Sequence, residues 1–495
     1  MSTLKMYIDG EWILNINNRT RKIISPINQQ EIALVTEGDR NYVDDAVKAA
    51  KRAISKGSEW RNITQQEKVY LLNKIADLIE ERSELLAKTE TINTGRLYKE
   101  TISDDVMGAA YEFRNYAGIL SEISGKTHNQ SSELFSFSIR EPIGVCGIIV
   151  PWNYPLMTAS SYIAATLAAG NSIIVKPSSY TPLTTILLFE ILEEVGLPRG
   201  VVNLVLGSGE EVGNTLATHE DLDMLIFTGS TETGIDILRN SRSIKKMELE
   251  LGGKSPIIVF DDIDLDVVVD NIMFTAFLSQ GQVCVAGSRL LVQDTIYKEL
   301  IDKLVKKTKK IRLGDPMNKS SQMGPICTKS HMEKILAYVK SGLYDGARLA
   351  CGGKRMTVEG LEDGFYIEPT IFVDCKQNMK IVKEEIFGPV LTVQSFNNES
   401  EAICMANDTK YGLTAQIYTD NIQRAIRVSD SIEAGMIWVN TYLESNGGCS
   451  VNPYKQSGIG TIGGLDGLIE FTKSKLIHIR TEPKKTNWFG DFTGN

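Results

Sequence analysis

Two residues of this sequence could support covalent chemistry. Cys284 follows Gly281 in a polar break between apolar segments, and Glu250 ends an apolar run directly before Gly252 and Gly253. A cysteine thiolate is a strong nucleophile, and a carboxylate at the end of a strand can serve as a general base. Each also has a simpler interpretation, because a free cysteine is most often a small buried residue and a carboxylate beside glycines can belong to a solvated turn.

Two further segments could bind a nucleotide. Residues 227–234 (FTGSTETG) close a predicted strand and open a predicted helix, so their backbone N–H groups could face a phosphate. The glycine spacing is not G-x-G-x-x-G, and a turn that merely needs glycine is the alternative. Lys176-Pro177-Ser178 ends another predicted strand, where the lysine is either a cation beside hydroxyls or a solvated group in a proline turn.

A regular alternation of strands and helices is expected to position these residues. Apolar β-type runs at 144–150, 172–175, 201–206, 224–228 and 246–250 alternate with helical stretches near 156–169, 182–195, 209–218 and 231–241. This pattern predicts parallel βαβ units with helices on both faces of the sheet. Ligands bind such sheets at the carboxyl ends of the strands.

The rest of the chain predicts three more parts. Residues 8–36 look β-rich, and a helical region follows, with apolar residues at helical spacing and a stop at Asn93-Thr94-Gly95. A second α/β domain is predicted from Pro256 to about Asn440, with strands at 256–260, 289–293, 390–395 and 435–440. The extended stretch 127–142 and the alternating tail from Lys473 could pair into an arm, which would suit contacts between subunits.

Composition excludes several classes of protein. A chain of 495 residues is too long for one hydrophobic core, and a formal net charge of −9 argues against a nucleic-acid partner. The most apolar window, 155–175, is interrupted by polar residues, so a buried helix and strand are expected and no membrane span. Seven cysteines without CxxC spacing, four histidines without HExxH and no visible secretory signal indicate reduced thiols, a cytoplasmic location and no metal.

Six strings together resemble the aldehyde dehydrogenase superfamily, in its order and spacing and over nearly the whole chain. They are 151–155 (PWNYP), 176–178 (KPS), 227–230 (FTGS), 250–254 (ELGGK), 281–284 (GQVC) and 384–389 (EEIFGP). Within that superfamily, bacterial betaine aldehyde dehydrogenases are the nearest resemblance. It rests on residues 140–147, 182–185, 454–458 and the terminal Asn487-Trp488-Phe489.

The resemblance implies an α/β fold in three parts. A Rossmann-like cofactor domain would comprise residues 1–122 and 143–252, and a second α/β catalytic domain residues 253–457. Residues 123–142 and 473–495 would form a small β oligomerisation arm, with 458–472 as a connecting segment. The implied protein is an NAD- or NADP-dependent enzyme acting on a small-molecule aldehyde as a homodimer or homotetramer, with no nucleic-acid or membrane partner.

The resemblance also assigns roles to individual residues. Cys284 would attack the aldehyde, Asn153 and the Cys284 backbone N–H would hold the oxyanion, and Glu250 would activate water. The cofactor contacts would be Ile149, Pro151, Trp152, Asn153, Lys176, Ser178 and Ser179 on the adenosine side, Gly209, Gly213, Phe227, Gly229, Ser230 and Thr233 at the pyrophosphate, and Leu251, Glu385 and Phe387 at the nicotinamide. The substrate pocket would include Tyr154, Ser161 and Val451.

Three departures from the family pattern matter. Ser179 stands where a ribose-binding Glu is usual, which favours tolerance of NADP. Tyr162 and Ile462 stand where many relatives have a buried Lys–Glu pair. The Lys and the Glu are expected to be lost together, because removal of one would leave a buried charge unpaired at a cost of roughly 3–5 kcal/mol. Val451-Asn452-Pro453 stands where the relatives have Trp-Gly-Gly, and Ser161 replaces a second aromatic ring of the betaine-specific relatives, so betaine aldehyde is predicted to be a poor substrate. Tyr442 and Glu444, in the same rebuilt segment, could restore some cation affinity.

Two rival functions follow from the same resemblance. A CoA-acylating relative would pass the thioester to a thiol and typically lacks the base that Glu250 provides. A catalytically silent binding protein would be expected to lose Cys284, Glu250 or Asn153, and all three are present.

Overall fold

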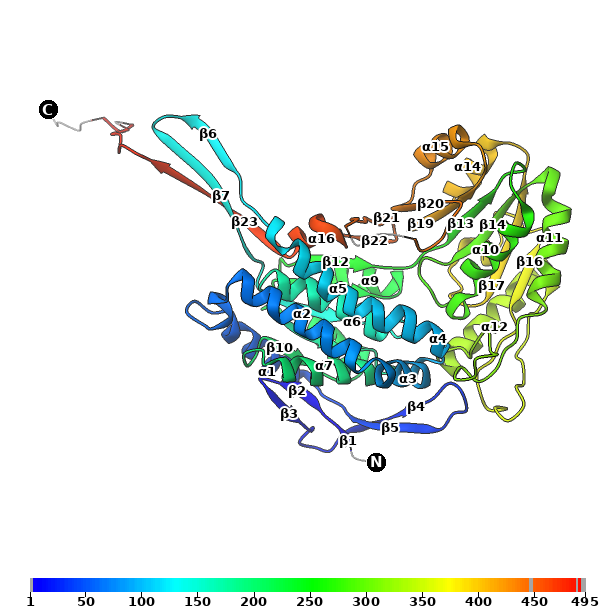
Figure 1. The fold of residues 1–495 in the computed structure, drawn as a ribbon, viewed down its shortest axis with the longest axis horizontal. Coiled ribbons are helices and arrows are strands. Elements are labelled where there is room, and N and C mark those ends of the chain that lie inside the picture. The colour runs from blue at the N-terminus through cyan, green and yellow to red at the C-terminus, as the bar shows by residue number, and fades with distance from the viewer. Residues whose placement is uncertain (1–2, 445–447, 487, 491–495) are drawn as a thin grey trace.

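The computed structural model describes residues 3–444, 448–486 and 488–490, and shows two α/β domains and a long β-arm (Figure 1). The first domain is built on a sheet of strand order β22-β12-β11-β8-β9-β10-β2-β3. Its five central strands are parallel: β8 (Val145–Ile149), β9 (Ser172–Lys176), β10 (Val202–Leu204), β11 (Met224–Thr228) and β12 (Lys246–Glu250). All five predicted strands are therefore confirmed.

Helices cover both faces of this sheet, as the alternating pattern predicted. One face carries α6 (Pro155–Ala168) and α7 (Leu183–Val195), with α2 (Gln65–Glu81), α3 (Ser83–Thr94) and α5 (Met107–Ile119) packed outside them. The other face carries α1 (Arg40–Ala53), α8 (Asn214–Thr218) and α9 (Thr231–Asn240). The helix expected near 209–218 begins as a π-helical turn, η4 (Gly209–Gly213), before α8.

The N-terminal region forms the predicted strands. The hairpin β2 (Met6–Ile8) and β3 (Glu11–Ile13) extends the first sheet, and β1 (Thr3–Leu4), β4 (Thr20–Ile24) and β5 (Glu31–Thr36) form a small separate sheet. The predicted stop is also confirmed: α3 ends at Thr94, and Gly95 caps it in the left-handed conformation at φ 82°. A short helix, α4 (Tyr98–Glu100), and a π-helical stretch, η2 (Thr101–Val106), lead into α5.

The second domain has a sheet of order β15-β16-β17-β14-β13-β19-β20. Four of its strands were predicted: β13 (Ser255–Val259), β14 (Gly287–Gln293), β17 (Val390–Phe396) and β20 (Met436–Val439). The strands β15 (Arg348–Cys351), β16 (Thr370–Val373) and β19 (Thr414–Tyr418) were not. Its longer helices are α10 (Leu265–Phe277), α11 (Asp294–Thr308), α12 (Lys329–Tyr344), α14 (Glu399–Asn407) and α15 (Ile422–Ser431).

The arm consists of β6 (Thr127–Ser131), β7 (Leu134–Pro142) and β23 (Thr472–Arg480), and projects away from both domains (Figure 1). Strands β7 and β23 pair antiparallel from Pro142↔Thr472 to Leu134↔Arg480, which confirms the predicted pairing. Residues 458–472 contribute β22 (Gly458–Ile459), which pairs with β12, and α16 (Gly464–Glu470), which packs on α5 and α6. Asn487 of the terminal string and residues 1–2 and 491–495 of the expected domain ranges lie outside the described residues.

All seven cysteines are free thiols. No helix in the described part of the chain is long and apolar enough to cross a membrane. Among the same residues, no group of three or more His, Cys, Asp or Glu side chains is placed to hold a metal ion.

Candidate active site

Cys284 lies in a loop of unusual backbone conformation between η5 (Leu278–Gly281) and β14. Ser279, Gln280 and Gly281 have φ of 49°, 62° and 67°, so three successive residues adopt the left-handed region. The Gln282 side chain helps to hold this loop, because its amide donates to the Ser279 carbonyl (3.3 Å) and its oxygen accepts from the Cys327 N–H (3.0 Å). The cysteine is thus presented by a fixed loop.

Three of the six strings meet at this loop. The Asn153 amide donates to the Gln282 carbonyl at 2.9 Å. A Cβ atom added at Gly253 would lie 2.5 Å from the Cys284 carbonyl oxygen, and one at Gly281 would lie 2.4 Å from the Gly388 carbonyl oxygen. At both positions a neighbouring carbonyl oxygen lies so close that only glycine, which has no Cβ atom, can be accommodated.

Glu250 ends β12 beside the loop that opens α9. Its backbone pairs with Thr228 of β11 and Gly458 of β22, and its carbonyl accepts from the Gly229 N–H at 3.0 Å. One carboxyl oxygen, Oε1, is buried without a hydrogen-bond partner in the described chain. Burial, followed by the charge of Glu248, raises the pKa of Glu250 well above its usual value. A carboxyl in this state suits proton uptake near neutral pH.

The surroundings of Cys284 favour the neutral thiol. Burial raises the pKa of its thiol to about 12, and the negative charges of Glu250 and Glu385 act in the same direction. The backbone N–H groups of Val285 and of Cys284 itself oppose this rise. The two carboxyls are therefore close enough to the sulfur to act on it, and the thiolate requires a compensating positive charge or a base.

Glu385 and Phe387 lie on the second domain's side of the site. Glu385 Oε1 accepts from the Gly253 N–H at 2.9 Å, and burial raises the pKa of this carboxyl to about 7. Phe387, at φ 58°, packs edge-on against Trp152 with ring centroids 5.3 Å apart. The His331 Nε2–H donates to the Phe387 carbonyl at 2.6 Å, and burial lowers the pKa of His331 to about 4, so this ring is neutral. These contacts connect the 151–155 and 384–389 strings.

The residues predicted at the adenosine side lie at the ends of β8 and β9. Ile149 is in register with Lys176, whose ammonium donates to the Pro177 carbonyl at 2.8 Å. Burial, followed by the charge of Arg21, lowers the pKa of Lys176 to about 8, while Glu37 opposes this. Ser178 and Ser179 line a small cavity with the Arg21–Glu37 ion pair, whose atoms are 2.6 Å apart.

The residues predicted at the pyrophosphate lie around the start of α9. Ser230 caps this helix by accepting from the Thr233 N–H at 3.2 Å, and Phe227 and Gly229 form the loop before it. Leu251 packs beneath, against Gly234. Backbone N–H groups at this helix start point in the direction expected of an anion site.

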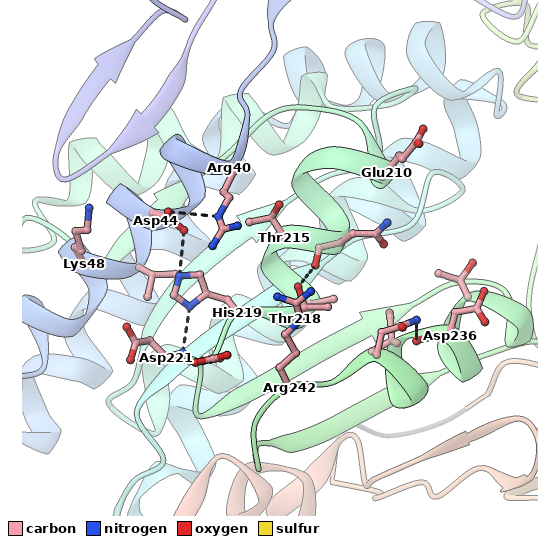
Figure 2. A pocket seen from close by; sticks show the side chains of 18 residues that line it. Arg40, Asp44, Lys48, Glu210, Thr215, Thr218, His219, Asp221, Asp236 and Arg242 are labelled. Atoms are coloured by element: carbon pink, nitrogen blue, oxygen red, sulfur yellow. Dashed lines mark hydrogen bonds and ion pairs between the residues drawn. The ribbon is translucent and has the colours of Figure 1, made fainter.

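A cavity of about 1260 Å³ opens beyond this helix start (Figure 2). Gly209 and Thr233, both predicted cofactor contacts, line it together with charged residues of α1 and of the loop after α8. Two of its lining residues, His219 and Asp44, contact each other, with Nε2 and Oδ1 3.3 Å apart. Cys284 does not line this cavity.

Tyr154 is held rigidly beside the nucleophile loop. Its hydroxyl bonds to Ser279 Oγ at 2.8 Å, and the guanidinium carbon of Arg96 lies 3.6 Å from its ring centroid. Arg96 is 1% exposed, donates to Ser279 at 2.9 Å and forms an ion pair with Asp105. One face of the Tyr154 ring is therefore already covered by a buried cation. Sequence reasoning missed Arg96, because an arginine after a helix-capping glycine usually indicates a solvated group.

Ser161 has a polar side-chain contact, and Val451 is held by backbone hydrogen bonds. The Ser161 hydroxyl donates to Glu112 at 3.3 Å, and burial raises the pKa of that carboxyl. Val451 and Ile462 form a two-hydrogen-bond bridge, with N···O distances of 2.8 and 3.0 Å. The segment around Val451 and the loop before α16 are thus held together by backbone hydrogen bonds.

Two other tyrosines adjoin the thiol. The Tyr162 hydroxyl bonds to Thr228 Oγ1 at 2.9 Å, and burial, with smaller contributions from Glu250 and Cys284, raises its pKa. Tyr442 packs edge-on against Trp438 and Phe274, with ring centroids 5.2 and 5.8 Å away. Its pKa is raised by burial first, and also by Tyr154 and Cys284. The sequence indicated Tyr442, but not its contacts with Trp438 and Phe274, because Phe274 comes from a helix about 160 residues before Trp438.

A thiol, a carboxyl and an amide thus meet between two α/β domains, at the carboxyl ends of a parallel sheet. This arrangement is typical of a nucleotide-dependent enzyme that works through a cysteine. The sequence pattern of the aldehyde dehydrogenase family matches residues 12–477. The chain belongs to the aldehyde dehydrogenase family, and its activity is oxidation of an aldehyde with NAD(P)⁺.

The individual relatives agree with this assignment. The chain is 45% identical over 486 residues to the betaine aldehyde dehydrogenase of Bacillus subtilis, covering 98% of this chain and 99% of that protein. It is 40% identical over 484 residues to aldehyde dehydrogenase 1A1 of Rattus norvegicus, covering 97% and 96%. The crystal structure of Staphylococcus aureus betaine aldehyde dehydrogenase in complex with NAD⁺ matches with a TM-score of 0.96 at 41% identity, covering 98% and 97%. The predicted superfamily, subgroup resemblance and fold are confirmed.

Proposed function

We propose that the chain converts an aldehyde to its carboxylate in two stages on Cys284. The thiol gives its proton to solvent, the sulfur bonds to the aldehyde carbon, and the carbonyl oxygen takes the electron pair as the oxyanion of a thiohemiacetal. Loss of hydride from that carbon leaves a thioester. Glu250 takes a proton from water, the water oxygen bonds to the acyl carbon, and the sulfur leaves. The observation that carries the proposal is the convergence of Asn153 and of the 250–254 string, which begins with Glu250, on the loop that presents Cys284.

The oxyanion of each tetrahedral species requires hydrogen-bond donors that are fixed in advance. Asn153 and the backbone N–H of Cys284 supply them. Because one hydrogen of the Asn153 amide is already held by the Gln282 carbonyl, the orientation of the other is set.

The described residues fit a nicotinamide dinucleotide. The Ser230-capped start of α9 suits a pyrophosphate, and the buried Lys176 supplies a cation near the ribose position. Trp152 and Pro151 would border the adenosine side, and Glu385 and Phe387 the nicotinamide side. When bound, the nicotinamide accepts the hydride, and its positive charge favours the Cys284 thiolate.

The Glu250→Gln variant tests the mechanism. It should form the thioester and release one equivalent of NAD(P)H in a burst, and then turn over slowly, because water is no longer activated. Mass spectrometry of the quenched protein should find the acyl group on Cys284. Wild-type turnover of this variant would contradict the role of Glu250.

Transfer of the acyl group to coenzyme A is the rival function on the same fold. The buried Glu250, with its raised pKa, supports hydrolysis, because a thiol acceptor does not require a base of this kind. Added coenzyme A should leave the rate unchanged and yield no acyl-CoA. A catalytically silent binding protein would show no NAD(P)H formation with any aldehyde.

We infer that NADP⁺ is accepted as well as NAD⁺. Ser179 removes the negative charge that would repel a 2′-phosphate, and Lys176 provides a cation. Arg21, on the wall that Ser179 shares, supplies a second positive charge, although Glu37 partly neutralises it. NAD⁺ still binds through the remaining contacts.

We infer that an uncharged or differently shaped aldehyde is preferred to betaine aldehyde. Ser161 and Val451 present no aromatic face, and Arg96 covers one face of Tyr154. Betaine aldehyde itself is the second candidate. It is favoured by the Tyr442–Trp438 pair, by the Glu112 carboxyl beside Ser161 and by the names of the most similar relatives.

The arm supports a homodimer or homotetramer. Phe135 and Ile479 are directly opposed across β7 and β23, and both are about half exposed. Such an apolar face on a projecting hairpin suits contact with another subunit. Seven free thiols favour a reducing cytoplasm.

A further inference from the structure

Strand β12 carries a second carboxyl beside Glu250. Glu248 precedes it by two residues, so the two side chains point to the same side of the sheet, about 6.5 Å apart along the strand. Glu248 is 1% exposed, which is rare for a glutamate without a cationic partner. The family-level mechanism above does not use it.

The loop before α16 is shaped around this carboxyl. Glu248 Oε2 accepts from the Thr461 N–H at 3.1 Å. Gly460, at φ 117°, leaves the necessary space, since a Cβ atom there would lie 2.0 Å from the same oxygen. The other oxygen, Oε1, is buried and has no hydrogen-bond partner among the described residues, as is also true of Glu250 Oε1.

The charges around the pair are predominantly negative. Burial, and then Glu470, raises the pKa of Glu248 to about 7, while the Thr461 N–H and Lys246 oppose this. Glu248 in turn raises the pKa of Glu250, and no cation acts on Glu250 in the described chain. The groups facing the pair are Lys246 on the same strand, Glu470 on α16, Tyr116 on α5, Tyr162 on α6, and Cys284. Lys246 is paired with Glu470, so it offsets only part of the negative charge at the site.

We propose that Glu248 is a positioning residue for the base. Its carboxylate lies on the same face of β12 as Glu250 and is held there by the Thr461 N–H. In this position it makes Glu250 a stronger base for water. Glu248 touches neither substrate nor cofactor in this role and acts only through Glu250. The inference rests on the proposed function, in which Glu250 activates the water that hydrolyses the thioester.

The sign of the effect follows from repulsion between like charges. A negative neighbour disfavours ionisation of Glu250, so it raises the pKa of Glu250 and strengthens it as a base. Without that neighbour, Glu250 ionises at lower pH but accepts a proton from water less readily. Removing the Glu248 charge should therefore move the acid limb of the pH–rate profile for deacylation to lower pH. It should also lower the deacylation rate on the plateau of that profile.

The experiment measures hydrolysis of the acyl-enzyme directly. The full-length protein is acylated with p-nitrophenyl acetate, excess ester is removed, and loss of the acetyl group from Cys284 is followed by mass spectrometry as a function of pH. In Glu248→Gln, the acid limb should move down by about one pH unit, and the plateau should fall by about three- to tenfold. Glu248→Asp, which keeps the charge, should retain most of the wild-type profile.

Glu90→Gln is the matched control. Glu90 is also fully buried and its pKa is raised to about 8, but it bonds to Thr184 and the Leu156 N–H, away from β12. Its profile should superimpose on that of the wild type. If Glu248→Gln does not fold, Glu248→Thr removes the same charge with a residue that suits a strand.

The outcomes separate this inference from the proposed function. A wild-type acid limb in the charge-removing variants, or an equal shift in Glu90→Gln, overturns the role of Glu248 and leaves Glu250 as the base. Deacylation of Glu250→Gln at the wild-type rate overturns the proposed function itself, whatever the Glu248 variants show.

Discussion

The Asn153 side chain donates a hydrogen bond to the Gln282 carbonyl, two residues before Cys284, at 2.9 Å. This bond joins the first domain to the loop that presents the thiol from the second. The bond places an amide donor beside the reacting sulfur and limits the rotation of the Asn153 side chain.

Replacing Asn153 should therefore impair the chemistry more than binding. Asn153→Ala removes one oxyanion donor, and kcat should fall by about 100- to 1000-fold, with a much smaller change in KM. Steady-state kinetics with any good aldehyde measures this, and a fluorescence titration with NAD⁺ controls for cofactor binding. A loss of less than about threefold would remove Asn153 from the oxyanion site.

Cys284→Ala should abolish both dehydrogenase activity and ester hydrolysis while cofactor still binds. The other six thiols cannot substitute: Cys146, Cys327, Cys351 and Cys375 are buried, and Cys404 and Cys449 are exposed on the surface. Cys404→Ala is the matched control and should retain wild-type turnover. Turnover near the wild-type rate in Cys284→Ala would contradict the covalent mechanism.

The sequence predicted the first sheet better than the second for a physical reason. Parallel strands buried on both faces read as continuous apolar runs, and β8, β9 and β11 come close to this pattern. Strand β19 does not, because it carries Gln416, which is buried but bonded to Thr275 at 2.7 Å. The polar residue interrupts the run without exposing the strand.

The parts of the site that were missed depend on contacts distant in sequence. The string 246–250 identified a strand, but only the fold shows that Glu248 is enclosed by Gly460 and Thr461. Arg96 likewise meets Tyr154 only in the fold, where its hydrogen bond to Ser279 joins the residue after the Gly95 cap to the nucleophile loop. The catalytic positions themselves could be proposed early, because they lie in contiguous strings.

Cofactor choice should respond to the charge at position 179. Ser179→Glu restores a carboxylate beside the ribose position, and like charges near a protein surface repel by a few kcal/mol. Its kcat/KM for NADP⁺ should fall by about tenfold or more, while the value for NAD⁺ should stay level or rise. Ser179→Ala is the neutral control. A wild-type preference for NAD⁺ above about a thousandfold would contradict the proposed tolerance of NADP⁺.

The arm should control assembly. Ile479→Asp places a charge in the exposed apolar face opposite Phe135, so it should weaken contacts between subunits. Light scattering after size exclusion should show a smaller assembly than for the wild type. Ser474→Asp, which adds the same charge on the same strand nearer the arm's base, serves as the control. An unchanged mass in Ile479→Asp would argue against a role of this face in assembly.

Betaine aldehyde should be a poor substrate. Its trimethylammonium group cannot donate a hydrogen bond, so it depends on aromatic faces worth about 0.5–2 kcal/mol each. Two rings of the betaine-specific pattern are absent at Ser161 and Val451, and the Arg96 guanidinium covers one face of Tyr154. The expected loss is about 1–4 kcal/mol, or tenfold to several hundredfold in kcat/KM.

Steady-state kinetics on betaine aldehyde beside aliphatic and aromatic aldehydes decides this. Ser161→Trp should raise kcat/KM for betaine aldehyde relative to an uncharged aldehyde of similar size, because it restores one ring. Tyr442→Leu measures the contribution of the remaining cluster, whose ring packs on Trp438. If betaine aldehyde is the best substrate by tenfold or more and Tyr442→Leu abolishes that preference, Tyr442 has replaced the lost rings and the prediction is wrong.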